Sequence, residues 1–586
     1  MNYNLNKTGE QEQKTSTWSA LISLLKLIGD EKKNLLFALL AILTNSAINL
    51  SGPFLIGYTI DHYVLTKQYG GVLLFTGILL VMYLVGLVAS YLQTNLMGSV
   101  GQRTLFTLRN AIFNKLQQLP VAFFNQNKAG DLISRVNSDT DKLNQFFSQS
   151  LMQFVSSIVT MTGAGIFLLS INIKLGAATL VPAVVIFIFT RALSPWVKRK
   201  NAVRLKAVGG LSAEIQDSIG NFKVIIAFNR RDYFKKRLNE STQHNFTTSV
   251  AAGLANTIFQ PVYEMLASLA QLTVLIFGIY LIAEGEFSIG LLVSYLAYST
   301  YFYNPLRQLA VLWVNFQLAM AGWDRIAEIL SLESDLPTVP AAATRLSSSF
   351  VEFKNVHFKY PDSAEILHNI NFKLERGKTY ALVGPTGGGK TTTASLIARL
   401  YDPTKGTILL DGKDLRSYSP AERAQKIGFI LQEPFLFTGT VKENILYGNE
   451  FYSNYSNEQL EQVIKEANLQ KLLAIFDKGL ETPVLPGGDS VSLGQKQLIA
   501  FMRAVLRKPE LLILDEATAN IDTVTEKLLG EILDKLPKET TRVIIAHRLN
   551  TIENADEIFF VNSGEVTPAG SFNHALDKLL HGTRVS

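Results

Sequence analysis

The sequence of 586 residues contains no cysteine, and only 18% of its residues are charged. The missing cysteine excludes disulfides, thiolate metal sites and a cysteine nucleophile, although it does not fix the redox compartment. Residues 1–15 also lack a short apolar core that ends in small residues, so a removed signal peptide is not expected. The chain is too long for one ordinary domain, and we expect at least two units.

Hydrophobic residues, by contrast, make up 47% of the chain and are concentrated in its first half. A membrane-spanning helix needs about 20 apolar residues. Six runs reach about that length, the last two with polar interruptions: residues 34–63, 71–100, 151–171, 175–193, 254–283 and 289–319. The sequence therefore predicts an all-α transmembrane domain with six helices.

Basic residues are concentrated in two of the connections between these runs, and Lys and Arg favour the cytoplasmic side. The second and fourth connections hold them, beginning with Arg103 and with Lys198, so both connections and both termini are expected to be cytoplasmic. This bias accounts for the net charge of +6 better than nucleic-acid binding does. Helical apolar spacing continues through both connections, which predicts long cytoplasmic extensions with transverse tips at residues 130–141 and 217–230.

Glu264 lies inside the fifth run, between Tyr263 and Met265. An ionisable side chain at membrane depth is costly and usually faces a wet cavity or the interior of a bundle. The sequence leaves three interpretations open: a substrate contact, a hydrogen bond between helices, or a position near the membrane interface.

The composition changes after residue 332. Residues 333–349 include Pro337 and Pro340 and read as a linker. From residue 350 onward, β-type runs alternate with helical segments, which predicts an α/β domain with a parallel sheet. The predicted domains are therefore 1–332, 333–349 and 350–586, with the β-type runs at residues 427–431, 510–514, 542–546 and 557–561.

A phosphate-binding loop is predicted at residues 384–391, GPTGGGKT, because the segment follows an apolar run and precedes a helical one. Glycines let the backbone curl so that its N–H groups point at phosphate oxygens. Lys390 would reach the β- and γ-phosphates, and the Thr391 hydroxyl would bind Mg²⁺. The nucleotide contacts expected here are Gly384, Pro385, Thr386, Gly387, Gly388, Gly389, Lys390, Thr391 and Thr392.

A second apolar strand, residues 511–514, ends in Asp515 and Glu516. Asp515 would hold Mg²⁺, as a carboxylate does in P-loop ATPases. Glu516 is placed to act as the general base on the attacking water. His547 follows another apolar strand and would contact the γ-phosphate or hold the base, unless it is only a structural surface residue.

Further motifs resemble those of ABC exporter half-transporters in order and in spacing. Tyr360 looks like the aromatic residue that stacks on adenine, and Gln432 in LQEP like the Q-loop glutamine. Residues 490–497, SVSLGQKQ, are similar to the ABC signature, LLILDEAT to the Walker B strand, residues 519–522 to the D-loop, and IIAHRL to the switch-histidine segment. Residues 123–141 are similar to the first coupling loop of these exporters.

The resemblance implies the following site. Glu516, His547 and Gln432 would be catalytic; Thr391, Gln432 and Asp515 would hold Mg²⁺. Tyr360 and Asp515 would contact the same ATP as the P-loop, and Ser492, Gly494 and Gln495 would contact the ATP of a partner. It also implies a multi-pass protein of the bacterial inner membrane that exports small lipophilic, amphipathic or cationic compounds of the multidrug type.

Two residues depart from the family pattern, one in the signature and one where exporters contact their coupling loops. Leu493 stands where the signature usually has glycine, and Pro486 stands where exporters commonly have a glutamate. An altered signature beside a sound P-loop favours a heterodimer with a second half-transporter. The alternatives are a homodimeric lipid flippase and a non-transporting, ATP-gated membrane regulator.

Overall fold

The computed structural model describes residues 3–5, 29–340, 349–361, 363–488, 490–515, 523–545 and 555–570. The chain divides into two compact units. The helical unit consists of Glu12–Leu116 and Gly130–Ser331, and the sheet unit of Met1–Gln11, Gln117–Ala129 and Leu332–Ser586. The start of the chain and the first interhelical tip thus group with the C-terminal half, which the sequence did not predict.

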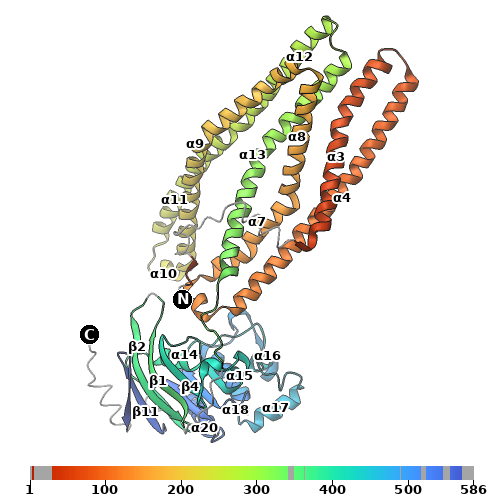
Figure 1. Ribbon diagram of the computed structural model, residues 1–586. Coiled ribbons are helices and arrows are strands. Elements are labelled where there is room, and N and C mark those ends of the chain that lie inside the picture. The colour runs from red at the N-terminus through yellow and green to blue at the C-terminus, as the bar shows by residue number, and fades with distance from the viewer. Residues whose placement is uncertain are drawn as a thin grey trace. The chain divides into compact units, whose positions relative to one another are not determined.

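Long helices form nearly all of the helical unit (Figure 1). They are α3 (Lys32–Thr59), α4 (Tyr69–Gln118), α8 (Leu151–Ile171), α9 (Ile173–Gly220), α11 (Arg231–Thr257), α12 (Phe259–Ala283) and α13 (Ile289–Ser331). Shorter helical segments are η1 (Gly29–Glu31), η2 (Ile60–Val64), α6 (Ala129–Ser134), η3 (Arg135–Asp139), α7 (Thr140–Gln145), η4 (Phe146–Ser150) and α10 (Phe222–Ala227).

Among the described residues, five helical stretches are long and apolar enough to cross a membrane. They are Lys32–Val64, Tyr69–Gln118, Ala129–Ile171, Ile173–Gly220 and Arg231–Ala283. The helix α13, with 43 residues, covers the sixth predicted run, whose membrane crossing stays a prediction. At a rise of 1.5 Å per residue, α4 and α9 extend far beyond a hydrocarbon core of about 30 Å. The predicted long helical extensions are therefore present.

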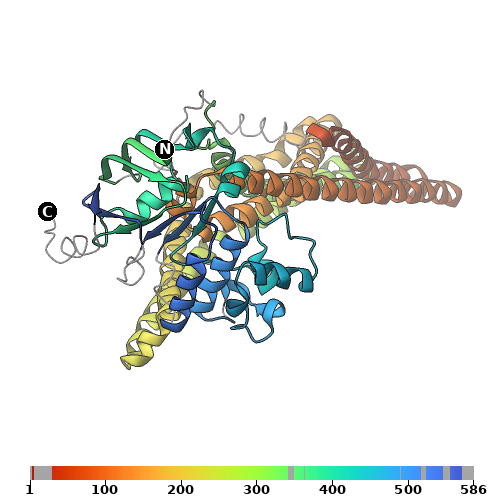
Figure 2. The same ribbon diagram turned by 90° about the horizontal axis from the view of Figure 1, so that it is seen from below.

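Close helix crossings hold the helical unit together. A Cβ atom placed on Gly290 of α13 would lie 2.0 Å from the Gly57 carbonyl oxygen of α3, so only glycine permits this approach. Buried tyrosines bond to backbone carbonyls of neighbouring helices, as Tyr295 Oη does to Leu168 O at 2.5 Å. The α9–α11 pair lies apart from the α3–α4 pair in both views (Figures 1 and 2).

The first predicted tip is wrong in position. The helix α4 ends at Gln118, and the short helix α5 (Val121–Gln126) follows Pro120, which has no N–H to continue a helix. Residues 130–141 belong instead to the uninterrupted helical stretch Ala129–Ile171. The second prediction fits the structure, because α10 lies within residues 217–230.

A six-stranded sheet with the order β12-β11-β3-β10-β9-β6 forms the centre of the sheet unit, and only β12 is antiparallel. Its strands are β3 (Thr379–Val383), β6 (Ile427–Ile430), β9 (Leu511–Asp515), β10 (Thr541–Ile545), β11 (Glu557–Asn562) and β12 (Glu565–Gly570). Every residue of β3 and β9 is buried. The predicted α/β domain with a parallel sheet is confirmed.

A second, antiparallel sheet has the order β2-β1-β4-β5. Its strands are β1 (Ser349–Lys359), β2 (Glu365–Glu375), β4 (Lys405–Leu410) and β5 (Lys413–Asp414); β7 (Gly439–Thr440) pairs with β8 (Pro483–Val484). The remaining elements are α14 (Lys390–Ile397), η5 (Leu415–Ser417), α15 (Pro420–Lys426), α16 (Val441–Ile445), α17 (Asn457–Glu466), α18 (Gln470–Leu473), η6 (Gly479–Glu481), η7 (Pro486–Gly488), α19 (Leu493–Leu506) and α20 (Thr523–Asp534).

Candidate functional site

The loop between β3 and α14 has the curled backbone that its glycines predict. Gly384 has φ 148° and Gly389 has φ 111°, a region that side chains rarely allow. Space is equally restrictive, since a Cβ on Gly384 would lie 2.0 Å from the Val561 carbonyl oxygen. On Gly389 it would lie 2.6 Å from Cδ2 of Leu367. Both glycines are therefore required by the close packing of this loop on β2 and β11.

Lys390 is the first residue of α14, and its side chain is held over this loop. Its ammonium group donates hydrogen bonds to the carbonyl oxygens of Gly384, at 2.9 Å, and Pro385, at 3.0 Å. The residue is only 6% exposed. A buried cation above a curled backbone is suited to an anionic ligand such as a phosphate chain.

Thr391 and Asp515 meet although Thr391 lies in α14, after β3, and Asp515 lies at the end of β9. Thr391 Oγ1 donates a hydrogen bond of 3.2 Å to Asp515 Oδ1. Asp515 is the last residue of β9, which lies two positions from β3 in the sheet. Parallel strands bring their carboxyl ends to one edge, which explains the proximity. A hydroxyl and a carboxylate oxygen are ligands that Mg²⁺ accepts beside phosphates and water.

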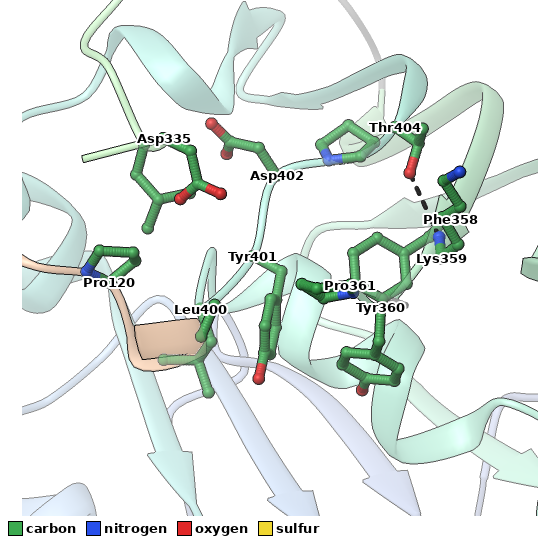
Figure 3. Close-up of a pocket in the computed structure, with 13 residues that line it drawn as sticks. Pro120, Asp335, Phe358, Lys359, Tyr360, Pro361, Leu400, Tyr401, Asp402 and Thr404 are labelled. Atoms are coloured by element: carbon green, nitrogen blue, oxygen red, sulfur yellow. Dashed lines mark hydrogen bonds between the residues drawn. The ribbon is translucent and has the colours of Figure 1, made fainter. Parts of the chain in front are cut away.

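Tyr360 lies beside the same helix. Its hydroxyl is 3.2 Å from Thr392 Oγ1, and its ring meets that of Tyr401 edge-on at 5.1 Å between centroids. The two rings lie side by side in Figure 3, at a cavity of about 470 Å³. Sequence reasoning missed Tyr401. Burial raises the pKa of its phenol, although a hydrogen bond from Asn125 opposes the shift.

The cavity has contributors from four segments of the sheet unit. They are Pro120 and the start of α5, the residues after Leu332, the end of β1 with the two residues that follow it, and the residues after α14. The lining residues are Pro120, Ala122, Asp335, Leu336, Phe358, Lys359, Tyr360, Pro361, Leu400, Tyr401, Asp402, Pro403 and Thr404 (Figure 3). An aromatic wall in such a cavity is suited to a planar ring.

The predicted signature begins α19 with a capping box. Ser492 Oγ accepts from the Gln495 N–H at 3.2 Å, and the Gln495 side chain accepts from the Ser492 N–H at 2.8 Å. Leu493 follows the cap and is 45% exposed. A bulky apolar side chain is therefore presented to solvent at a helix N-terminus, the part of a helix that attracts anions.

Comparisons with known proteins agree with this geometry. The protein-family model of the ABC transporter transmembrane region matches residues 35–306. The family model named ABC transporter matches residues 367–519. The fatty acid ABC transporter ATP-binding/permease protein of Mycobacterium bovis is 32% identical over 496 residues, 85% of this chain and 78% of that protein. This chain belongs to the ABC exporter family.

Two further comparisons cover almost the whole length of this ABC exporter. The multidrug resistance ABC transporter ATP-binding and permease protein of Lactococcus lactis is 28% identical over 552 residues, 94% of this chain and 92% of that protein. The solved structure of a bacterial Atm1-family ABC exporter with ATP bound superposes with a TM-score of 0.78 at 25% identity. It covers 94% of this chain, and this chain covers 96% of it.

The remaining predicted site residues are either outside the described residues or exposed on the surface of the sheet unit. Glu516, His547 and residues 519–522 lie outside the described residues. Gln432 is exposed and follows β6 by two positions, whereas Pro486 is exposed at the start of η7. The structure thus brings together the P-loop, Tyr360 and Asp515 around one end of α14.

In the helical unit of the exporter, Glu264 has a partner that sequence reasoning missed. Arg307 Nη1 of α13 lies 3.3 Å from Glu264 Oε1 of α12, and Gln260 also donates to this oxygen at 3.0 Å. Both charged residues lie about 27 to 29 Å along their helices from the turn at residues 284–288. A hydrocarbon core is about 30 Å thick, so a membrane with one edge at that turn would have its other edge near the pair.

Proposed function

We propose that this chain is one subunit of an ATP-driven exporter of lipophilic or amphipathic compounds, of the multidrug type, in the bacterial inner membrane. The observation that carries the proposal is the contact between Thr391 and Asp515 beside Lys390 in a chain that also contains long apolar helices. Both termini and the ATPase domain face the cytoplasm. ATP closes two nucleotide domains on each other, closure turns the membrane cavity outward, and hydrolysis resets it.

The residues of the sheet unit divide the work on ATP. The backbone of residues 384–389 and Lys390 bind the phosphates, Tyr360 stacks on adenine, and Asp515, Thr391 and Gln432 hold Mg²⁺. When bound there, Mg²⁺ would neutralise negative charge on the phosphates. Glu516 orients and deprotonates the attacking water, and His547 holds the γ-phosphate.

The lipophilic substrate class is supported by two observations. One relative is named for fatty acids, which are amphipathic molecules, and the other is named for multidrug resistance. The Glu264–Arg307 pair supplies a half-exposed charged site near one edge of the apolar region. Ionisable groups in such regions face a bundle interior or a wet cavity. A homodimeric lipid flippase is the second candidate for the same reasons.

A heterodimer with a second half-transporter is proposed because of Leu493. In an ABC dimer the signature of one chain completes the ATP site at the other chain's P-loop. The exposed Leu493 side chain stands where a γ-phosphate must approach the helix N-terminus closely. The site completed by this signature then mainly holds ATP, and the P-loop of this chain hydrolyses ATP against a regular signature of the partner.

The experiment is ATP-dependent transport in sealed, inverted membrane vesicles that contain the chain together with the product of a neighbouring transporter gene. Accumulation of lipophilic dyes that requires ATP, with dye-stimulated ATPase activity, is the expected result. ATP binding without transport of dyes or fluorescent lipids supports the ATP-gated regulator instead. Lipid movement without dye movement, by the chain alone, supports the homodimeric flippase.

A further inference from the structure

The first described residues of the chain are buried in the sheet unit. Tyr3 is 1% exposed and Leu5 is 5% exposed. The Tyr3 hydroxyl donates to the carbonyl oxygen of Glu333 at 3.0 Å and accepts from the N–H of Asp335 at 2.7 Å. Residues 3–5 therefore contact the start of the segment that leads into β1, more than 300 residues later in the chain.

The same three residues also contact the end of α5. The N–H of Tyr3 donates to Gln126 Oε1 at 2.7 Å, and Asn127 Nδ2 donates to the Tyr3 carbonyl at 2.8 Å. Asn127 Oδ1 accepts from the N–H of Leu5 at 3.1 Å. The Tyr3 ring also meets the fully buried Phe123 edge-on at 6.2 Å. Residues 3–5 are therefore held against the end of α5 by several hydrogen bonds and a ring contact.

The helix α5 also contacts the proposed nucleotide site, through Asn125. Asn125 Nδ2 donates to the Tyr401 hydroxyl at 2.7 Å, and the Tyr401 ring packs edge-on against Tyr360. Tyr360 in turn lies within 3.2 Å of Thr392, in the first turn of the P-loop helix. All these residues belong to the sheet unit, so the chain of contacts runs within one compact body.

We propose that Tyr3 is a positioning residue for ATP binding, which holds α5 against the segment 333–335 and thereby keeps Tyr401 in place beside Tyr360. The inference rests on the proposed function, in which Tyr360 stacks on adenine. If α5 is released, Tyr401 loses the partner of its hydroxyl and the Tyr360 ring loses the neighbour that fixes its orientation. Binding of ATP then weakens, whereas the groups around the γ-phosphate keep their positions.

Burial supports this arrangement chemically. It raises the pKa of the Tyr3 phenol, and the nearby carboxylate of Asp335 raises it further. The hydroxyl therefore stays protonated at physiological pH and remains able to donate to the Glu333 carbonyl. A phenylalanine at this position would keep the ring contact with Phe123 and remove both hydroxyl hydrogen bonds.

The test compares Tyr3→Phe with Tyr418→Phe in the complete exporter. Tyr418 is also buried, but its hydroxyl donates to the carbonyl of Leu410 in β4, at 2.9 Å, rather than to α5 or to residues 333–335. Loss of a hydrogen bond of ordinary strength changes an equilibrium by about threefold to tenfold. We expect Tyr3→Phe to raise the KM for ATP by about that factor with kcat within about twofold, and Tyr418→Phe to leave KM unchanged.

A second variant tests the path through α5. Asn125→Ala, at an exposed position, removes the bond to Tyr401 and should raise KM as Tyr3→Phe does. In the double variant, the increase should be no larger than in either single variant, because both changes interrupt one path. A melting temperature measured without nucleotide separates this effect from a general loss of stability.

The inference is overturned if Tyr3→Phe lowers the melting temperature but leaves the KM for ATP unchanged, or if the two substitutions add in full. If the Tyr3 variant yields no folded protein, an unchanged KM in Asn125→Ala overturns it as well. If the unaltered exporter has no ATPase activity, the proposed function itself is contradicted. The two failures are thus distinguishable.

Discussion

Thr391 Oγ1 of α14 donates a hydrogen bond to Asp515 Oδ1 of β9 at 3.2 Å, across a separation of 124 residues. Asp515 is only 2% exposed, so its charge is stabilised by partners in the interior of the site. This hydrogen bond joins the helix that follows the phosphate-binding loop to the acidic end of β9, so both belong to one site.

This pair predicts a dependence on Mg²⁺. Asp515→Asn keeps the size of the side chain and removes its charge, so Mg²⁺ should bind more weakly and ATP turnover should fall about 100-fold or more. Thr391→Ser retains the hydroxyl and serves as the matched control. The measurement is ATPase activity against Mg²⁺ concentration. An unchanged Mg²⁺ dependence in the Asn variant would show that Asp515 does not hold the ion.

Glu516 is predicted to be the general base. Glu516→Gln should lower turnover by about 10²- to 10⁴-fold, because a positioned base contributes that much to proton transfer. ATP binding should persist, since Lys390 and the loop glycines are unaltered. Equilibrium binding of a fluorescent ATP analogue and steady-state phosphate release test both parts. Phosphate release near the wild-type rate would remove Glu516 from the mechanism.

The pair of Glu264 and Arg307 predicts a charge effect on transport. Glu264→Gln should weaken transport of cationic dyes more than of neutral ones, because it leaves Arg307 as an uncompensated positive charge. Arg307→Gln is the reciprocal variant and should shift the preference toward cations. Uptake of a cationic and a neutral dye into inverted vesicles gives the ratio. Equal loss for both dyes in both variants would indicate a role in helix packing.

Leu493 predicts asymmetry between two ATP sites. If the partner's P-loop faces a degenerate signature, Leu493→Gly should raise ATPase activity of the heterodimer at the partner's site, because backbone and phosphate can then approach closely. Leu493→Ala is an intermediate control. If the purified chain alone forms a stable dimer with full dye-stimulated ATPase activity, and Leu493→Gly changes nothing, the heterodimer proposal is wrong.

The ion pairs of Glu510 with Lys426 and Arg376 predict that the stability of the sheet unit falls in acid. Burial tends to raise its pKa, but hydrogen bonds from Lys426 and Arg376 outweigh it and lower the pKa. The pairing therefore stabilises the fold above the unfolded-state pKa of about 4.3, and this stabilisation is lost as the pH falls through the lower folded-state value.

Because the Glu510 side chain is 36% exposed, the contribution is small, at most about 1 kcal/mol. Glu510→Gln should lower the melting temperature at pH 7 and lessen its fall as the pH drops below about 4.3. Glu375→Gln, which breaks the exposed pair with Lys378, is the control. An equal fall with pH in the wild type and in the Glu510 variant would contradict the assignment.

Local patterns in the sequence were sufficient for much of the fold and site. The apolar runs predict membrane helices because crossing a bilayer depends on length and composition, and the loop 384–391 is recognisable because its curl depends on the glycines within it. The parallel sheet follows from alternating strands and helices. These features are determined by residues close together in the sequence.

Tertiary structure decided what depends on distant partners. The sequence alone placed the first tip at residues 130–141, but the chain turns at Pro120, and the contacts of α5 with Tyr3 and Tyr401 bridge 123 and 276 residues. Arg307 was no more conspicuous than other arginines until α13 brought it to Glu264. No spacing rule connects such residues, because their proximity results from the packing of whole helices and sheets rather than from local backbone geometry.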